Sequence, residues 1–175
     1  MRAERRRPAW SQGGFFLIEA MVAILIFALG ILGLVAMGST AVSAQSDAQY
    51  RTEASSLADA IAGELALGID RSSEATKAAS LANFVHQPNP APTTVPAPCA
   101  FAGTAVTAAA APGLAALIAR AANSGTGPGL PGATAVNQQI FVDGAGNFNR
   151  VVITLCWKTA SDSAWRRHTL VTYVN

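Results

Sequence analysis

The chain has 175 residues, of which 51% are hydrophobic and 13% are charged, a length that suits one domain or one domain with an appendage. The net charge of +2 comes from the N-terminus, because from Phe15 onward eight basic side chains stand against nine acidic ones. Proteins that bind nucleic acid carry a basic stripe on their folded part. The near-balanced charge argues against that class, and no nucleic acid is expected as a partner.

A single hydrophobic stretch dominates the N-terminal region. The segment from Ala20 to Met37 has 18 residues and no charge. As a helix it would be roughly 27 Å long, close to the thickness of the hydrocarbon core of a bilayer. It is preceded by four arginines, Arg2, Arg5, Arg6 and Arg7. Basic residues at this place favour an N-terminus held in the cytoplasm and a translocated remainder. The sequence therefore predicts one membrane-spanning segment at most.

Two ordinary interpretations of this stretch are open. The first is a secretory signal, because Val42-Ser43-Ala44 suits cleavage before Gln45, and the remainder would then be a secreted binding protein. The apolar run is longer than such signals have, however, and Glu19 lies inside its leading edge. The second is a plain single-span anchor. It leaves Glu19 unexplained, since an unpaired acid in a spanning helix costs on the order of 1–3 kcal/mol.

The stretch GGFFLIEAMVAIL, which begins at Gly13, closely resembles the class III signal of the type IV pilin family. The shared features are a short basic leader, a glycine, a hydrophobic residue and a glutamate fifth after the cut. The resemblance implies that a prepilin peptidase removes residues 1–14 by cutting between Gly14 and Phe15, and that it N-methylates Phe15. Residues 15–38 would be kept for the membrane and for assembly. Glu19 would pair with the N-terminal amine of a neighbouring subunit.

The helical pattern continues beyond the hydrophobic stretch. No proline occurs over residues 15–86, and three apolar residues recur at helical spacing, Leu57, Ile61 and Leu65. We predict one helix over about residues 15–67, ended by Gly68. Its first half is hydrophobic all round, and its second half has one apolar face. Residues 39–175 would form a periplasmic pilin-like head that includes this amphipathic half.

Shorter elements follow the long helix. Asp70 is a candidate cap for a short helix over Ser72–Val85. Five prolines between Gln87 and Pro98 predict an extended connector that is neither helix nor central strand. Pro112–Ala122 suits a short helix with proline at its start, and the glycine-rich segment 123–132 is a loop.

The C-terminal part of the chain changes to a period of two. Alternation predicts strands over Val136–Val142, Val151–Trp157 and Trp165–Val174, an antiparallel meander of about three strands. Its apolar face should pack on the helix stripe. The expected fold is therefore α+β, a pilin-like lollipop whose long helix is packed on a small head. Cys156 would point away from that core.

The two cysteines, Cys99 and Cys156, are 57 residues apart, which excludes a CxxC redox or zinc motif. If the body of the protein lies outside the cytoplasm, a disulfide between them is the simplest interpretation. It would tie the proline-rich connector to the sheet and, on the chain-entropy model, contribute about 4 kcal/mol. Two unrelated buried thiols are the alternative.

The sequence shows none of the clustered chemistry that enzymes need. It has no nucleophile elbow, phosphate loop or metal-ligand spacing, so we expect neither an enzyme nor a cofactor or metal site. His86 beside the connector and His168 on a strand are expected to be solvated. The run Trp165–His168 suits an acidic partner or DNA, but a solvated strand face is the simpler interpretation.

Within the pilin family, the wide cysteine spacing resembles that of PilV-type minor pilins, the type IV pilus modification proteins. Weaker resemblances are ASSLADAIAGEL, GLPG at Gly129–Gly132 and VVITLCW at Val151–Trp157. The resemblance implies a location in the inner membrane, single-pass with the head in the periplasm, and then in the pilus. The implied partners are prepilin peptidase, other minor pilins, the major pilin and a tip adhesin. The rival in the family is the I-type pseudopilin of type II secretion.

Overall fold

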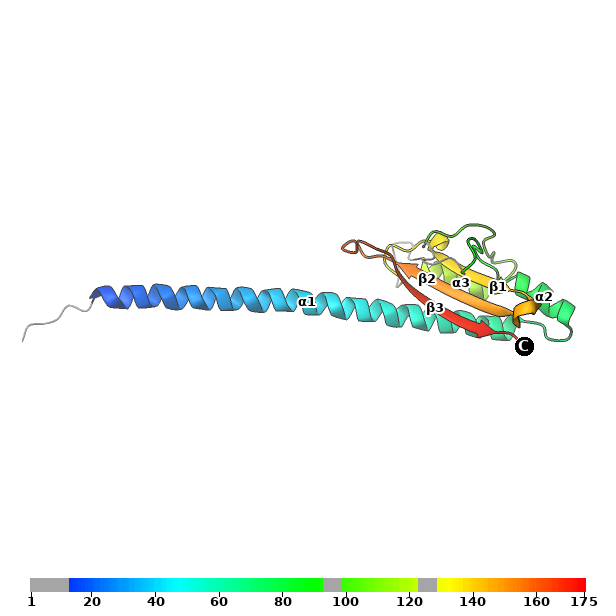
Figure 1. Cartoon of the computed structure of the whole chain (residues 1–175), viewed down its shortest axis with the longest axis horizontal. Helices are drawn as coiled ribbons and strands as arrows, with labels where there is room; N and C mark the ends of the chain where they lie inside the picture. Colours follow the sequence, from blue (N-terminus) through cyan, green and yellow to red (C-terminus); the bar gives the residue numbers. More distant parts are fainter. Residues whose placement is uncertain (1–12, 93–98, 123–128) are drawn as a thin grey trace, which may run out of the picture. The chain divides into compact units, whose positions relative to one another are not determined.

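The computed structural model describes residues 13–92, 99–122 and 129–175, with the side chains of 13–15 and 145 excepted. The chain divides into two compact units, residues 1–46 and residues 47–175. Most of the predicted leader, residues 1–12, lies outside the described part, as do residues 93–98 of the proline-rich connector and 123–128 of the glycine-rich loop. Figure 1 shows the elements in chain order.

A single helix, α1 (Gly13–Gly68), runs through both units, close to the predicted range of 15–67. In the first unit the described large apolar side chains of α1, from Phe16 to Val42, are all exposed. In the second unit one stripe is buried, made up of Ala54, Leu57, Ala58, Ile61 and Leu65. The sequence pattern explains this change, because the first half of α1 is apolar on all sides, whereas the second half has an apolar side and a polar side.

Gly68 ends α1, as the sequence predicts. A Cβ at this position would collide with the ring of Phe84, so the close approach of the next segment requires glycine here. The guanidinium of Arg71 donates to the carbonyl oxygens of Ala66 at 2.9 Å and Ile69 at 3.3 Å. The bond to Ala66 satisfies a carbonyl that the helix end leaves without an intrahelical partner.

The next helix, α2 (Glu74–Ala82), is shorter than the predicted Ser72–Val85, and its predicted cap was wrong. Ser73 is the N-cap: its hydroxyl accepts from the amide of Thr76 at 3.1 Å, while the Thr76 hydroxyl accepts from the amide of Ser73 at 3.0 Å. Asp70 instead accepts from the amide of Ser72 at 2.8 Å. The reciprocal pair satisfies two free helix donors at once, which a lone aspartate does not.

Helix α3 (Pro112–Ala121) confirms the helix predicted from its proline start. It has no side-chain cap of its own at Ala111. The carboxylate of Glu64 lies there instead, so close that a Cβ on Gly113 would be 2.8 Å from its Oε1 atom. At the other end, Arg120 donates to Glu53 at 2.6 Å. The ion pair with Glu53 and the proximity of Glu64 show that α3 runs antiparallel to α1, with a negative charge near its N-terminus and a positive one at its C-terminus, as the helix dipole favours.

Three strands form one antiparallel sheet in the order β1-β2-β3, namely β1 (Gln138–Asp143), β2 (Arg150–Trp157) and β3 (Arg166–Tyr173). The predicted meander is confirmed. The first strand starts later than predicted, because Val136 belongs to a 3₁₀ turn, Ala135–Asn137. In that turn Asn137 accepts from the amide and the hydroxyl of Thr134, which takes this stretch out of the strand conformation.

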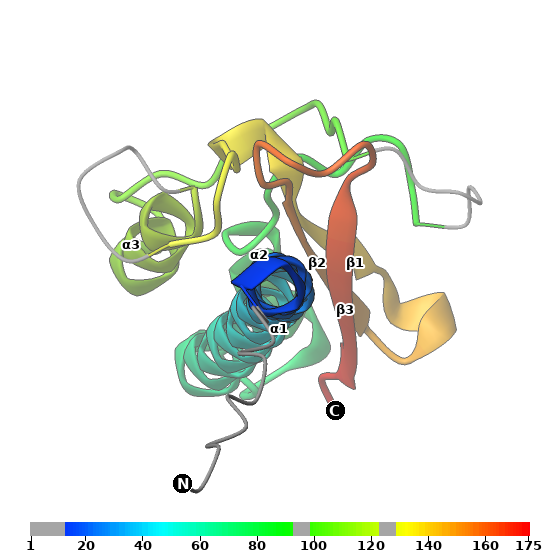
Figure 2. The ribbon, with the colours of Figure 1, turned by 90° about the vertical axis from the view of Figure 1, so that its left-hand side faces the viewer.

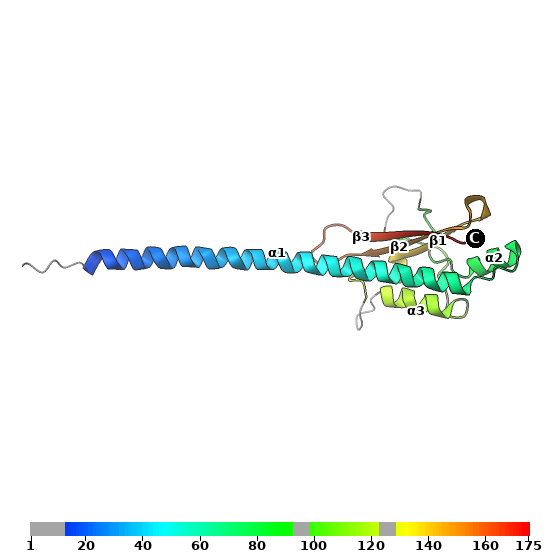
Figure 3. The same ribbon diagram turned by 90° about the horizontal axis from the view of Figure 1, so that it is seen from below.

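Each face of β2 is covered by a different part of the chain. Val151, Ile153, Leu155 and Trp157 join one core cluster with the α1 stripe, as predicted, and α3 contributes Leu114 and Ile118 to it. In the second unit, α1 lies between the sheet and α3 (Figures 2 and 3). The opposite face carries Cys156, which packs with Cys99 and Phe101. The predicted α+β class is therefore confirmed.

Candidate functional site

The first candidate site is the apolar part of α1. Of the described helices, one is long and apolar enough to cross a membrane, and no residue of its most apolar window is buried within the protein. A core helix of a soluble protein would be mostly buried, whereas this exposure is consistent with a single membrane span or a signal. Between Phe16 and Ser46 the only charged side chain is Glu19, and it is exposed.

The residues predicted for processing lie at the start of this helix. Gly14 and Phe15 belong to the first turns of α1, with their side chains outside the described part. Glu19 follows Phe15 by four residues, and positions so spaced lie on the same side of a helix. Among the described residues Glu19 has no ion pair. The structure therefore presents an uncompensated carboxylate one turn from the predicted new N-terminus.

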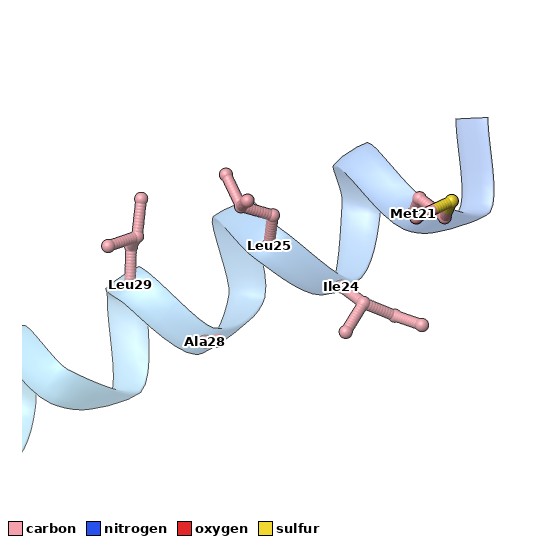
Figure 4. A pocket seen from close by; sticks show the side chains of 5 residues that line it. All are labelled: Met21, Ile24, Leu25, Ala28 and Leu29. Carbon is pink, nitrogen blue, oxygen red and sulfur yellow. The ribbon is translucent and has the colours of Figure 1, made fainter. Parts of the chain in front are cut away.

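The apolar surface next to Glu19 offers contact area rather than an enclosed cavity. A shallow hollow on the side of α1 is lined by Met21, Ile24, Leu25, Ala28 and Leu29. Figure 4 shows these side chains projecting from the ribbon of α1. Polar groups that would orient a small ligand are missing from this set. The hollow suits lipid chains or the apolar side of another helix.

The predicted disulfide between Cys99 and Cys156 is confirmed, with Cα atoms 5.8 Å apart. Buried amides hold the two cysteines in place from both sides. The side chain of Asn137 donates to the carbonyl oxygen of Cys99 at 2.5 Å. The side chain of Gln138 donates to the carbonyl of Cys156 at 3.1 Å and accepts from its amide at 3.3 Å. The bond is thus part of a packed and hydrogen-bonded cluster.

His86 is buried, with 2% of its surface exposed, so the prediction that it is solvated was wrong. The amide of Val106 donates to its Nδ1 atom at 3.2 Å, and Nε2 lies 2.9 Å from the carbonyl oxygen of Ala135. Nδ1 is therefore the acceptor and Nε2 carries the proton. Burial lowers the pKa of His86, against a smaller raising effect of the Ala135 carbonyl. This side chain joins three distant segments as a neutral structural group, a role that no local pattern signals.

The run Trp165–His168 is less solvated than predicted. Arg166 and His168 are half-buried, and Arg166 forms ion pairs with Asp47 of α1 and, at 2.9 Å, with Asp162. The hydrogen bond from Arg166, aided by bonds from Thr159, lowers the pKa of the Asp162 carboxyl to about 2. These contacts attach the start of β3 to α1, and they use the charge that would otherwise attract an acidic partner.

Within residues 13–92, 99–122 and 129–175, no group of three or more histidine, cysteine or carboxylate side chains is placed to hold a metal ion. The potential ligands are dispersed, since both cysteines are joined to each other and His86 is enclosed by backbone groups.

The elements define a pilin-like architecture, with a long apolar N-terminal helix, a small antiparallel sheet of three strands and a disulfide. No family model, curated protein or solved structure matches the chain. The structure therefore shows a pilin-like fold.

Proposed function

We propose that this protein is a minor pilin of a type IV pilus, processed by a prepilin peptidase and acting in the filament or in priming its assembly. The observation that carries the proposal is the exposed carboxylate of Glu19 in a helix that has no other charge up to Ser46. A charge in an apolar environment is unfavourable unless a group of opposite sign meets it. The ammonium of a neighbouring subunit, freed by cleavage before Phe15, is such a group.

The continuity of α1 supports the same proposal. A secretory signal is discarded, so nothing requires its helix to continue into the folded domain. Here the apolar segment and the amphipathic segment are one uninterrupted helix, Gly13–Gly68, and the latter supplies part of the main core. A helix of this kind can be kept in the membrane and then transferred into a filament without refolding the head.

Mass spectrometry of the N-terminus of the protein isolated from cells tests the proposal. We expect a mature chain that begins at Phe15 with a methylated amine. A mature chain that begins at Gln45 would instead show a secreted protein, and a chain that keeps residues 1–14 would show an unprocessed anchor. Either result would contradict the minor-pilin proposal.

Replacement of the acid tests the role of Glu19 separately. We expect Glu19→Ala and Glu19→Gln to be cleaved before Phe15 but to be missing from sheared pili, because the charged partner of the ammonium is lost. Asp59→Ala is the matched control, since Asp59 is an exposed acid on the second half of the same helix. Normal incorporation of Glu19→Gln would exclude the pairing role, and loss of Asp59→Ala would show that any acid on α1 matters.

A further inference from the structure

The disulfide joins two cysteines whose surroundings differ. Cys156 belongs to β2, the central strand, which is paired with β1 on one side and with β3 on the other. Cys99 begins a covering segment, residues 99–105, in which Ala100 and residues 102–105 are exposed. The exposed fraction of Cys99 is 8%, and that of Cys156 is 0%. The bond therefore links the middle of the sheet to a segment at the surface.

The covering segment is attached to the head by local contacts. The amide of Phe101 donates to the carbonyl of Val136 at 2.8 Å. Ala102 exchanges two backbone hydrogen bonds with Asn89, at 2.8 and 2.9 Å. Breaking these bonds leaves both strand pairs of β2 intact, and local openings of this kind cost less free energy than the separation of strands in a sheet. An opening of the covering segment alone therefore uncovers Cys99.

Cys156 is shielded more completely on the same face of the sheet. Its side chain packs with Cys99 and Phe101 in a small cluster that is separate from the main core. Its backbone is held as well, because the Gln138 side chain bonds its carbonyl at 3.1 Å and its amide at 3.3 Å. A reagent reaches the sulfur atom of Cys156 after Phe101 has moved away, whereas part of Cys99 is exposed already.

Thiol–disulfide exchange depends on access to the sulfur atom that is attacked. An external thiolate displaces one sulfur from the other along the line of the S–S bond, so it approaches the attacked sulfur from the side away from its partner. At Cys156 this approach is closed whatever its direction, because the residue has no exposed surface. At Cys99 some surface is open. The two sulfur atoms of the bond are therefore not equivalent toward an external thiol.

We propose that Cys99 is the site at which external thiols and disulfides exchange with the head. In reduction, the external thiolate forms a bond with the sulfur of Cys99, the bond to Cys156 breaks, and Cys156 leaves as the thiolate. In formation, the Cys99 thiolate attacks a disulfide oxidant and expels one of its thiolates. The Cys156 thiolate then attacks the sulfur of Cys99 and expels the other, so two cysteine thiols are oxidised and one oxidant disulfide is reduced to two thiols. The inference goes beyond the minor-pilin role and does not depend on it.

Trapping of the mixed disulfide on the full chain in detergent micelles tests the proposal. The oxidised protein is treated with reduced glutathione, and iodoacetamide added soon afterwards alkylates the thiol that is released. Peptide mass spectrometry should find glutathione on Cys99 and the alkyl group on Cys156, in at least about tenfold excess over the reverse arrangement. The same treatment in guanidinium should abolish this excess. An even distribution in the native protein, or glutathione mainly on Cys156, would overturn the proposal.

Variants with one cysteine measure the first step of bond formation without internal exchange. Cys156→Ala keeps the Cys99 thiol, Cys99→Ala keeps the Cys156 thiol, and each variant is mixed with oxidised glutathione. In the native state we expect the mixed disulfide to form at least about tenfold faster on Cys156→Ala, and in guanidinium at similar rates on both. Fluorescence of Trp157 shows whether each variant is folded. Equal native rates on folded variants would contradict the proposal, and the trapping result on the wild type decides if either variant unfolds.

Phe101→Ala tests the shield over Cys156. Phe84→Ala is the matched control, since Phe84 is a buried aromatic residue of the main core. Loss of the Phe101 ring should lower the preference for Cys99 at least about threefold through faster attack on Cys156, with the rate at Cys99 little changed. Phe84→Ala should keep the preference although it destabilises the head. An unchanged preference in Phe101→Ala, or its loss in both variants, would contradict the proposal.

Discussion

Reduction of the disulfide should remove a large part of the stability of the folded head. Cys99 and Cys156 are 57 residues apart, and on the chain-entropy model closing such a loop stabilises the folded state by about 4 kcal/mol. Domains of this size have total unfolding free energies of about 5–15 kcal/mol. Reduction leaves both sulfur atoms in place. The loss of stability should therefore come from the greater freedom of the unfolded chain and from the release of the segment that carries Phe101 over β2.

Guanidinium unfolding of the oxidised and reduced full chain in micelles measures this difference. Fluorescence of the buried Trp157, the neighbour of Cys156, reports on the head. We expect a lower midpoint after reduction, and Cys99→Ala should behave like the reduced wild type. Ser163→Ala, at an exposed position, should leave the midpoint unchanged. Coinciding midpoints for oxidised and reduced protein would refute the argument, because they would show that the Gln138 and Asn137 contacts alone hold the segment.

Two further predictions concern the head. Gly132 has a φ of 62°, and a Cβ at this position would collide with the Lys158 carbonyl, so Gly132→Ala should lower the unfolding free energy by about 2–3 kcal/mol. Gly63 lies at an open helical position, so Gly63→Ala should raise the unfolding free energy by about 0.5–1 kcal/mol. Equal denaturant midpoints for the two variants would contradict this argument. His86 has a lowered pKa, so its contribution is complete above pH 6.5 and is lost as pH falls from there toward its folded pKa. Unfolding midpoints should therefore drop as the pH falls below about 6.5 in the wild type and less in His86→Gln, and identical pH profiles would contradict the burial argument.

Periodicity accounts for the parts of the fold that were predicted correctly. The α1 stripe at Leu57, Ile61 and Leu65 is visible because every member repeats at helical spacing and packs against one surface. The strands are visible because Val151, Ile153 and Leu155 alternate with residues of the other face. In both cases the periodic pattern is formed by residues close together in the sequence, and the tertiary packing buries the side that the pattern indicates.

Some predictions were wrong because segments distant in the sequence determine the surroundings of the side chain. His86 looks like a solvated residue beside prolines, and it is buried because Val106 and Ala135, 20 and 49 residues further along the chain, both bond its ring. The cap of α2 failed for a different reason. Asp70 and Ser73 are both good candidates, and the choice depends on the reciprocal bond that Thr76 makes only with Ser73.

The acids on the second half of α1 explain why the rest of the head packs at one position along this helix. Asp47 pairs with Arg166 at the start of β3, and Glu53 pairs with Arg120 in the last turn of α3. Glu64 lies at the first turn of α3. An apolar stripe alone tolerates sliding by one helical turn, because Leu57, Ile61 and Leu65 are spaced about one turn apart and chemically similar. A shift of one turn would separate Asp47 and Glu53 from their arginine partners and would move Glu64 away from the start of α3, so the charges select the register that the stripe leaves open.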